Sequence, residues 1–587
     1  MPIINTSSTT SVTAARVVDG TQTLVKTSTT SSVTTLSAKD LEAIKALEDT
    51  IIANADPDFP QQSESETRQA YISRCLIAKG TAALSIAVKG DGGDILWYKT
   101  YGVKRNAQGL ADAVKNGLKD ATLPPWMANA NEEEVSDFHA EQRKERDEIL
   151  TESVLDTAEC LGLKDSPVTF ATVFQAASIS KPITAMAIMR LVQRGVLDLN
   201  RDIREYLETA EWKLPVSLSD GVDLNQPTTL RQLLGHAAGT SVSGFGGYNR
   251  KQVRVGKIAL PSIVQVLNGD GNSGKVEINA LPNTIPQYSG GGTTVAQFVV
   301  ETVTGKPMSQ IIDEEIVKPL NLTNTTATLE DSPNGGDFAC AHMFTECLPV
   351  AGGYHLYPET SAAGLWTTPM EILKIQDALF KSLQGNSEFL SKDLAQEMVT
   401  ARYPSFAGAC PGVGWFVTDC DFTHSGGNAG FVCDAYTNKH TGSGIAWMAS
   451  SEFEAFDLME DARKAISKAY GFPERAPRVK PTPKKGVPES LDDCLGIYSM
   501  IVSAGNLFSS DFVKPIIRVA KSEKEGQELD FFFPSLNGGV SSTRKSNQEN
   551  SEDFFKFKVL DRMVGEFTVR ENGEIWFSFE GTHFVKE

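Results

Sequence analysis

The fold is decided by the stretch from Phe174 to Gly195, which reads FQAASISKPITAMAIMRLVQRG. Its apolar residues return to one broad face at helical spacing, and they are Ile183, Met186, Ala187, Met189, Leu191 and Val192. Pro182 suits the first turn of a helix, and Gly195 suits the position where a helix ends. The pattern therefore predicts a buried helix with Ser178 at its N-terminal end.

Ser178 and Lys181 stand three residues apart, which is nearly one helical turn, so both side chains are expected on the same face. A hydroxyl becomes a good nucleophile when a base removes its proton, and a lysine amine does this where burial and nearby positive charge favour its neutral form. Backbone N–H groups at a helix N-terminus suit an oxyanion beside the serine. Ser542 and Lys545 repeat the spacing in a polar, charged stretch without a helical pattern, so Ser178 is the preferred candidate.

Length and composition limit the class of protein. A chain of 587 residues exceeds a single core and suggests two to four domains. Hydrophobic and charged contents of 41% and 22% are those of an ordinary soluble globular protein. The net charge of −19 argues against nucleic acid or an anionic membrane as partner. No apolar stretch approaches roughly 18 residues and no signal peptide pattern opens the chain, so a cytoplasmic location is expected.

The sequence carries no signal for a metal or a cofactor. Its eight cysteines are scattered without a CxxC pair, and we expect them to be mostly free thiols. The glycines after Tyr288 resemble a phosphate loop only superficially, because neither GxxxxGK[ST] nor GxGxxG occurs there.

Changes in composition divide the chain into four parts. Residues 1–36 form a Ser/Thr-rich N-terminal arm, for which disorder is favoured over an added strand. Residues 37–472 form the main domain, with an acidic helical insertion at about 103–167. The alternating charges of the insertion favour a solvated face, with a lid or a subunit contact as the alternative. Residues 473–488 form a proline-rich linker, and residues 489–587 are expected to form a small all-β barrel.

Within the main domain, the pattern of apolar residues predicts several elements. They are a helix at Ala38–Ala53, a hairpin of 81–89 and 94–102, short antiparallel strands within 412–450, and a helix at about Glu452–Tyr470. His236 closes another helix, and a structural or capping role is preferred over a catalytic one.

Three motifs follow one another along the chain: Ser178-Ile-Ser-Lys181 on a helix, Tyr288 on a glycine-rich loop, and His424-Ser-Gly426-Gly427 on a strand. Together they resemble the serine β-lactamase-like superfamily, especially its class C β-lactamase, esterase and D-aminopeptidase branch. The resemblance implies an α+β fold, in which an antiparallel sheet of the β-lactamase/transpeptidase type is flanked by helices and joined by an all-α region. The C-terminal part resembles the lipocalin-like modules of some D-aminopeptidases.

The resemblance also implies roles for the six site residues. Ser178 would be the nucleophile that accepts the acyl group, and Lys181 and Tyr288 would share its proton. His424 would donate a hydrogen bond to the substrate or to Tyr288, on the same strand as Gly426. The N–H groups of Ser178 and Gly427 would form the oxyanion hole.

Two departures from the family pattern bear on the substrate. The usual tyrosine-x-asparagine motif is Tyr288-Ser289-Gly290 here, so a glycine takes the place of the asparagine. His424 stands where the strand usually carries a lysine. Both changes favour an ester or amide without a fixed acidic group over penicillins. The expected function is thus a serine hydrolase acting on a small-molecule ester or amide, with an acyltransferase or a non-catalytic binding protein as alternatives. A homo-oligomer is left open.

Overall fold

A computed structural model describes the main domain with side chains and the two ends of the chain as backbone strands. The residues with side chains are 36–55, 59–109, 136, 166–217, 227–280, 282–283, 287–329, 333–343, 347–401, 409–452 and 455–472. Most of the predicted insertion at 103–167 lies outside the described residues. Its solvated face, and the alternatives of a lid or a subunit contact, therefore stay predictions.

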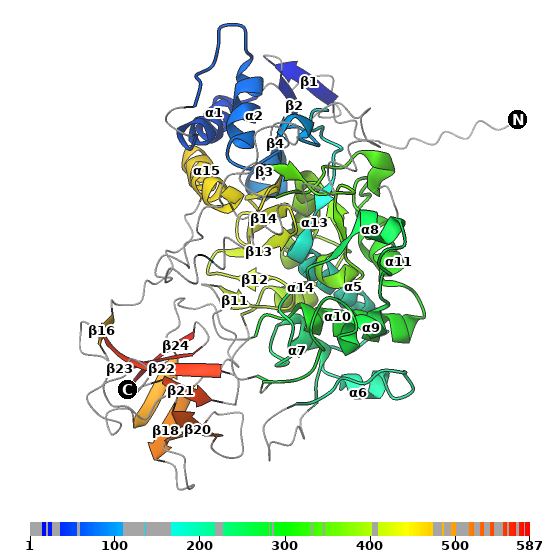
Figure 1. Ribbon diagram of the computed structural model, residues 1–587, viewed down its shortest axis with the longest axis vertical. Coiled ribbons are helices and arrows are strands. Elements are labelled where there is room, and N and C mark those ends of the chain that lie inside the picture. Colours follow the sequence, from blue (N-terminus) through cyan, green and yellow to red (C-terminus); the bar gives the residue numbers. More distant parts are fainter. Residues whose placement is uncertain are drawn as a thin grey trace, which may run out of the picture.

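A nine-stranded antiparallel sheet forms the centre of the main domain (Figure 1). In spatial order its strands are β1 (Ala14–Val18), β2 (Thr21–Val25), β4 (Ile95–Gly102), β3 (Ala83–Lys89), β15 (Gly444–Ser450), β14 (Phe431–Asn438), β13 (Asp421–Asn428), β12 (Phe416–Val417) and β11 (Cys410–Pro411). The predicted hairpin is confirmed, because β3 pairs antiparallel with β4. The pairing of β3 with β15 joins distant parts of the chain.

The edge of this sheet corrects the preference for a disordered N-terminal arm. β1 and β2 form a hairpin, and Leu24 of β2 pairs with Tyr98 of β4. The preference for disorder is therefore wrong for these ten residues, and the added-strand alternative holds. The Val and Thr residues of β1 and β2 favour strands, despite the Ser/Thr-rich composition of the whole arm.

The two faces of the sheet bury side chains of different size, because successive residues of a strand point to opposite faces. Large residues cover one face, and they are Leu84, Ile86, Val88, Trp97, Tyr101, Val432, Tyr436, Ile445 and Trp447. Helices α1 (Ala38–Ala53), α2 (Arg68–Ile77) and α15 (Glu454–Tyr470) pack on this face. Mostly smaller residues face the other core, among them Ala83, Ala87, Ala435 and Ala446. The predicted helices at 38–53 and about 452–470 are confirmed.

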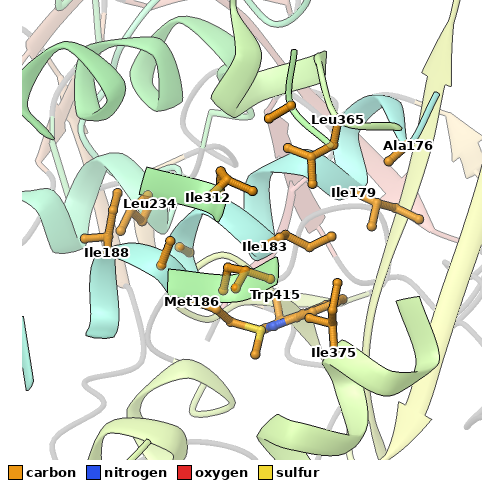
Figure 2. Close-up of a cluster of buried hydrophobic side chains, with 14 of the residues drawn as sticks. Ala176, Ile179, Ile183, Met186, Ile188, Leu234, Ile312, Leu365, Ile375 and Trp415 are labelled. Atoms are coloured by element: carbon orange, nitrogen blue, oxygen red, sulfur yellow. The ribbon is translucent and has the colours of Figure 1, made fainter. Parts of the chain in front are cut away.

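The second face carries the all-α region. Its helices are α5 (Ser180–Gln193), α6 (Ile203–Tyr206), α7 (Leu230–Leu234), α8 (Arg250–Arg254), α9 (Ile263–Asn268), α10 (Gly290–Thr304), α11 (Met308–Ile312), α12 (Thr360–Ala363), α13 (Pro369–Leu383) and α14 (Lys392–Met398). Figure 2 shows α5 within this core, with Ile183 and Met186 surrounded by side chains such as Trp415 and Ile375. The predicted α+β architecture, an antiparallel sheet flanked by helices, is confirmed for the main domain.

Short paired segments connect the helices near the N-terminus of α5. They are β5 (Phe174–Gln175) with β10 (Trp366–Thr367), β6 (Tyr248–Asn249) with β9 (His355–Leu356), and β7 (His342–Met343) with β8 (Leu348–Pro349). Short turns complete the main domain, and they are η1 (Asp91–Gly93), η3 (Ala177–Ile179), η4 (Asp313–Val317) and η5 (Pro333–Gly336). The β5–β10 pair places α12 beside the residues that precede Ser178.

A buried carboxylate holds the segment that contains β10. Glu371 is 0% exposed, and it accepts hydrogen bonds from the backbone N–H of Thr323 at 2.8 Å and from the hydroxyl of Thr325 at 2.6 Å. It also accepts from the backbone N–H of Asn324, while Thr326 and Trp366 exchange backbone hydrogen bonds. Because a buried charge is tolerated only when fully hydrogen-bonded, Glu371 fixes residues 323–325 against the start of α13.

The C-terminal strands form a second antiparallel sheet. Its strands are β16 (Lys484–Gly486), β22 (Met563–Arg570), β21 (Lys556–Val559), β20 (Val540–Arg544), β19 (Leu529–Phe532), β18 (Ile516–Lys521), β17 (Gly496–Met500), β24 (Thr582–Lys586) and β23 (Ile575–Phe579). β23 pairs with β22 as well as with β24. β16 lies inside the stretch predicted as a linker, so part of that stretch belongs to the sheet.

Among the described residues, no helix combines the length and apolar character that a membrane span requires. Four of the described cysteines carry free thiols, and they are Cys75, Cys410, Cys420 and Cys433.

We expect Glu371→Ala to lower the free energy of unfolding by at least about 3 kcal/mol, because several buried donors lose their charged acceptor at once. Urea denaturation followed by circular dichroism measures the change. Lys374→Ala on the exposed side of the same helix is the matched control and should change stability by no more than about 0.5 kcal/mol. Equal effects of the two substitutions would contradict the assigned role of Glu371.

Candidate active site

Ser178 lies in the turn η3, at the point where the chain enters α5. The preceding residue, Ala177, has a φ of 45°, in the left-handed region that a residue with a β-carbon rarely adopts. Such strain persists only where the surrounding structure holds it, and it is frequent at functional sites. Ser178 is half-buried, whereas its neighbours Ala177 and Ile179 are fully buried. The strained turn thus leaves the serine as the more accessible residue of η3.

Lys181 lies one turn further along and is 3% exposed. Its Nζ donates a hydrogen bond to Ser178 Oγ at 2.9 Å and another to the carbonyl oxygen of Ala362 at 2.9 Å. The same nitrogen lies 4.9 Å from the centre of the Tyr288 ring. The structure therefore brings together the serine, the lysine and the tyrosine from two distant segments of sequence.

Tyr288 lies immediately before α10, whose N-terminus is capped by the Ser289 hydroxyl at 2.8 Å from the N–H of Gly292. The neighbouring loop packs closely here, because Ser289 Oγ donates to the carbonyl oxygen of Ser241 at 2.7 Å. A β-carbon on Gly290 would lie 2.9 Å from the Phe245 ring. An asparagine at this position, as in the family pattern, would require the Phe245 ring to move.

His236 accepts hydrogen bonds from the residues on either side of Tyr288. Its carbonyl oxygen accepts from the N–H of Gln287 at 2.9 Å, and its Nδ1 accepts from the N–H of Ser289 at 3.2 Å. The His236 and Tyr288 ring centres are 4.5 Å apart. An imidazole that accepts through Nδ1 carries its proton on Nε2, and burial together with Lys181 and His424 keeps the pKa of His236 well below its usual value. The structural role expected for His236 thus includes support of the Tyr288 loop.

His424 lies on β13, and its ring centre is 6.2 Å from that of Tyr288. Its Nδ1 is 2.5 Å from the carbonyl oxygen of Ser425. A carbonyl oxygen only accepts, so Nδ1 carries the proton of the neutral ring and Nε2 presents a lone pair. Burial and the charge of Lys181 lower the pKa of His424 to about 3, which keeps the ring neutral. With this tautomer the ring presents an acceptor at Nε2, whereas the expectation from the sequence was a donor to the substrate or to Tyr288.

Gly426 brings β13 directly against the serine turn. A β-carbon at Gly426 would lie 2.7 Å from the carbonyl oxygen of Ala176 and 3.0 Å from the backbone nitrogen of Ser178. Any side chain here would push the strand away from η3. Gly427 follows on the exposed side of the strand and pairs with Val432.

Two contributors to the site escaped the sequence analysis. Ala362 acts through its backbone carbonyl, which no residue type reveals. Phe416 of β12 lies near three of the site rings, with centre distances of 5.9 Å to His236, 6.2 Å to Tyr288 and 5.2 Å to His424. The sequence Gly412-Val-Gly-Trp-Phe-Val indicated only that Phe416 lies in a strand, and gave no sign of its contact with the site.

Glu359 is an unusual carboxylate immediately before α12. It is 0% exposed, and both of its carboxylate oxygens lack a hydrogen-bond partner among the described residues. Burial raises the pKa of Glu359 to about 7, because the charged form is disfavoured away from water. The native protein therefore holds this proton at pH values where the unfolded chain has lost it.

We expect the contribution of Glu359 to stability to fall as pH rises from about 5 to 8, because burial raises its pKa and the native state must release a proton that the unfolded chain has already lost. Glu359→Gln carries no titrating group, so the stability of this variant relative to wild type should improve across that range. The improvement should be about 3 kcal/mol, since one pKa unit corresponds to about 1.4 kcal/mol. Urea unfolding at both pH values measures it.

The matched control for this experiment is Glu388→Gln, which changes an exposed glutamate. Its stability relative to wild type should change little between the two pH values. A constant difference between Glu359→Gln and wild type would show that Glu359 is charged throughout the range.

Comparison with known proteins assigns the chain to a family. Residues 151–470, more than half of the chain, match the family model described as Beta-lactamase. The unguisins hydrolase ungD' of Aspergillus campestris is 28% identical over 219 residues, which are 34% of this chain and 36% of that protein. The esterase EstB of Burkholderia gladioli is 27% identical over 161 residues, which are 27% of this chain and 38% of that protein. The matches thus span little more than a third of the length of these relatives.

Among solved structures, the crystal structure of SurE has a TM-score of 0.51 and 16% sequence identity, and the likeness covers 94% of this chain and 100% of that chain. At this identity the likeness concerns the fold alone. The antiparallel sheet with its flanking helices, the resemblance noted from the three motifs and the match of the family model agree. The chain belongs to the Beta-lactamase family, within the serine β-lactamase-like superfamily.

Proposed function

We propose that this protein is a serine hydrolase that cleaves a small-molecule ester or amide through an acyl-enzyme on Ser178. The observation that carries the proposal is the 2.9 Å hydrogen bond between Lys181 Nζ and Ser178 Oγ at the start of a buried helix. A neutral amine at this distance can take the proton of Ser178 as a general base, with the hydrogen bond then running from the hydroxyl to the amine. The family relationship and the names of the relatives, a hydrolase and an esterase, support the same reaction class.

In the first step, the Ser178 oxygen forms a bond to the substrate carbonyl carbon while its proton passes to the pair of Lys181 and Tyr288. The tetrahedral intermediate then breaks its bond to the leaving group, which receives the proton. In the second step, water attacks the acyl carbon and gives a proton to the same pair. The bond between that carbon and the Ser178 oxygen then breaks, the oxygen takes the proton back from the pair, and the acid is released. The short contacts among Ser178, Lys181 and the Tyr288 ring support this division of roles.

The negative oxygen of the intermediate requires donors beside Ser178. We assign these to the backbone N–H groups of Ser178 and Gly427. The close approach of Gly426 to the Ser178 nitrogen supports the assignment, because it brings β13 to the serine turn.

The substrate class follows from the two departures from the family pattern. His424 is neutral where a lysine would attract a carboxylate, and Phe245 fills the space beside Gly290. We therefore propose an ester or amide without a fixed acidic group, and weak activity at most toward penicillins and cephalosporins.

The proposal also covers the division of the chain. Residues 37–472 would form the catalytic domain, and the C-terminal strands would form a small barrel like the lipocalin-like modules of some D-aminopeptidases. Pairing of β22 with both β21 and β23 supports a ring of strands. Pairing of β16 with β22 indicates that the linker ends before residue 484 rather than at 488. A cytoplasmic location and a homo-oligomer remain predictions.

A fluorophosphonate probe should add covalently to the wild-type protein, and intact-protein mass spectrometry should detect one adduct. Ser178→Ala should abolish the adduct, and Lys181→Ala should slow its formation by about 10²-fold or more, because the base is lost. Ser542→Ala is the matched control, since it removes the serine of the other Ser-x-x-Lys sequence, and it should react as wild type does. An adduct that survives Ser178→Ala would exclude the proposed nucleophile.

Acyl transfer to an alcohol or amine would proceed through the same acyl-enzyme. With a p-nitrophenyl ester as donor, we expect the free acid as the main product in water, because the hydrolase needs no second acceptor. Product analysis with and without an added alcohol tests this expectation. An acylated alcohol as the main product at low alcohol concentration would identify an acyltransferase instead.

A further inference from the structure

The side chain of His424 points toward the serine turn. Alternate residues of a strand share a face, so His424 and Gly426 lie on the same side of β13. The Gly426 side of the strand faces the carbonyl oxygen of Ala176 and the backbone nitrogen of Ser178. The ring of His424 also lies close to those of Tyr288 and Phe416, at 6.2 Å and 5.2 Å between centres. The imidazole therefore belongs to the wall of the proposed acyl-binding site.

The free nitrogen of this ring is a hydrogen-bond acceptor. Nδ1 donates to the carbonyl oxygen of Ser425, so the proton of the neutral ring is not available to Nε2. Within the described part of the chain, Nε2 is buried and has no hydrogen-bond partner. His424 is 3% exposed, and a buried acceptor left without a hydrogen-bond partner is unfavourable. A ligand that donates a hydrogen bond at this position would supply that partner.

We propose that His424 Nε2 accepts a hydrogen bond from an N–H or O–H group on the substrate, next to the scissile carbonyl. The preferred acyl groups would then carry a donor, as α-hydroxy and α-amino acyl groups do. A carboxylate at the same place would meet a lone pair instead of a donor and would be disfavoured. The inference rests on the proposed hydrolase function and specifies its substrate class.

Neighbouring charges are compatible with this role. The titratable groups that face His424 are Lys181, His236 and Tyr288. Lys181 disfavours a second positive charge nearby, and the pKa of His236 is also lowered by burial. The acceptor should therefore keep its lone pair throughout the pH range of ordinary assays.

The test compares p-nitrophenyl esters that differ only at the α-carbon of a propanoyl group. The 2-hydroxy ester offers a donor, the 2-methoxy ester offers only an acceptor, and the 2-carboxy ester carries a negative charge. We expect wild-type kcat/KM to be about tenfold or more higher for the hydroxy than for the methoxy ester, and lowest for the carboxy ester, because a site with an acceptor rejects analogues that lack the donor. The ratio of hydroxy to methoxy should be constant from pH 6 to 9.

Two variants distinguish acceptance from simple packing. His424→Leu fills the same place with an apolar side chain that has no acceptor. The ratio of kcat/KM for the hydroxy ester to that for the methoxy ester should therefore fall to about twofold or less. His424→Lys presents only hydrogen-bond donors. In this variant, kcat/KM for the methoxy ester and for the carboxy ester should each rise relative to kcat/KM for the hydroxy ester. A wild-type protein that shows no preference, or a preference that survives His424→Leu, would overturn the inference.

The fluorophosphonate adduct keeps this result separate from the general reaction. The ester preferences are compared only between proteins that form the Ser178 adduct, because the adduct shows that a variant is folded and that its nucleophile works. If wild type forms no adduct and cleaves none of the three esters, the proposed hydrolase function fails. If it forms the adduct and cleaves all three esters equally, the hydrolase function stands and the role of His424 is wrong.

Discussion

The arrangement of the site depends on the burial of one amine. Lys181 is 3% exposed, and it is held between the hydroxyl of Ser178 and the carbonyl oxygen of Ala362. A buried amine needs such acceptors, because burial of an amine without hydrogen bonds is unfavourable in free energy. The carbonyl comes from α12, whose place depends on the β5–β10 pair and, beyond it, on Glu371. Elements nearly 200 residues apart in sequence therefore fix one short hydrogen bond.

Much of this could be predicted because it is local. The apolar face of α5 and the spacing of Ser178 and Lys181 are properties of a single helix, so the sequence pattern alone places the two side chains together. The hairpin of β3 and β4 was predicted for the same reason, since its turn and both strands lie within 22 residues. The order of the three motifs along the chain then indicated the family.

The remaining features depend on contacts between distant segments or on backbone atoms. The carbonyl of Ala362 is such a case, and so is the support of the Tyr288 loop by His236, which adopts a φ of 57°. The tautomer of His424 follows from a hydrogen bond to its neighbour's carbonyl and is invisible in residue types. The N-terminal hairpin was missed because the Ser/Thr-rich composition of the arm outweighed the strand-favouring Val and Thr residues of β1 and β2.

The two imidazoles near Tyr288 differ in polarity although they share a cause. Both are neutral, because burial and the nearby Lys181 disfavour a second positive charge. Backbone partners then decide the tautomers. His236 accepts a hydrogen bond from an N–H at Nδ1 and carries its proton on Nε2, whereas His424 donates a hydrogen bond from Nδ1 to a carbonyl oxygen and has a lone pair on Nε2. A lysine in place of His424 would offer charge and donors only. On the role proposed for His424, a histidine in place of that lysine would give the strand a hydrogen-bond acceptor instead of a positive charge.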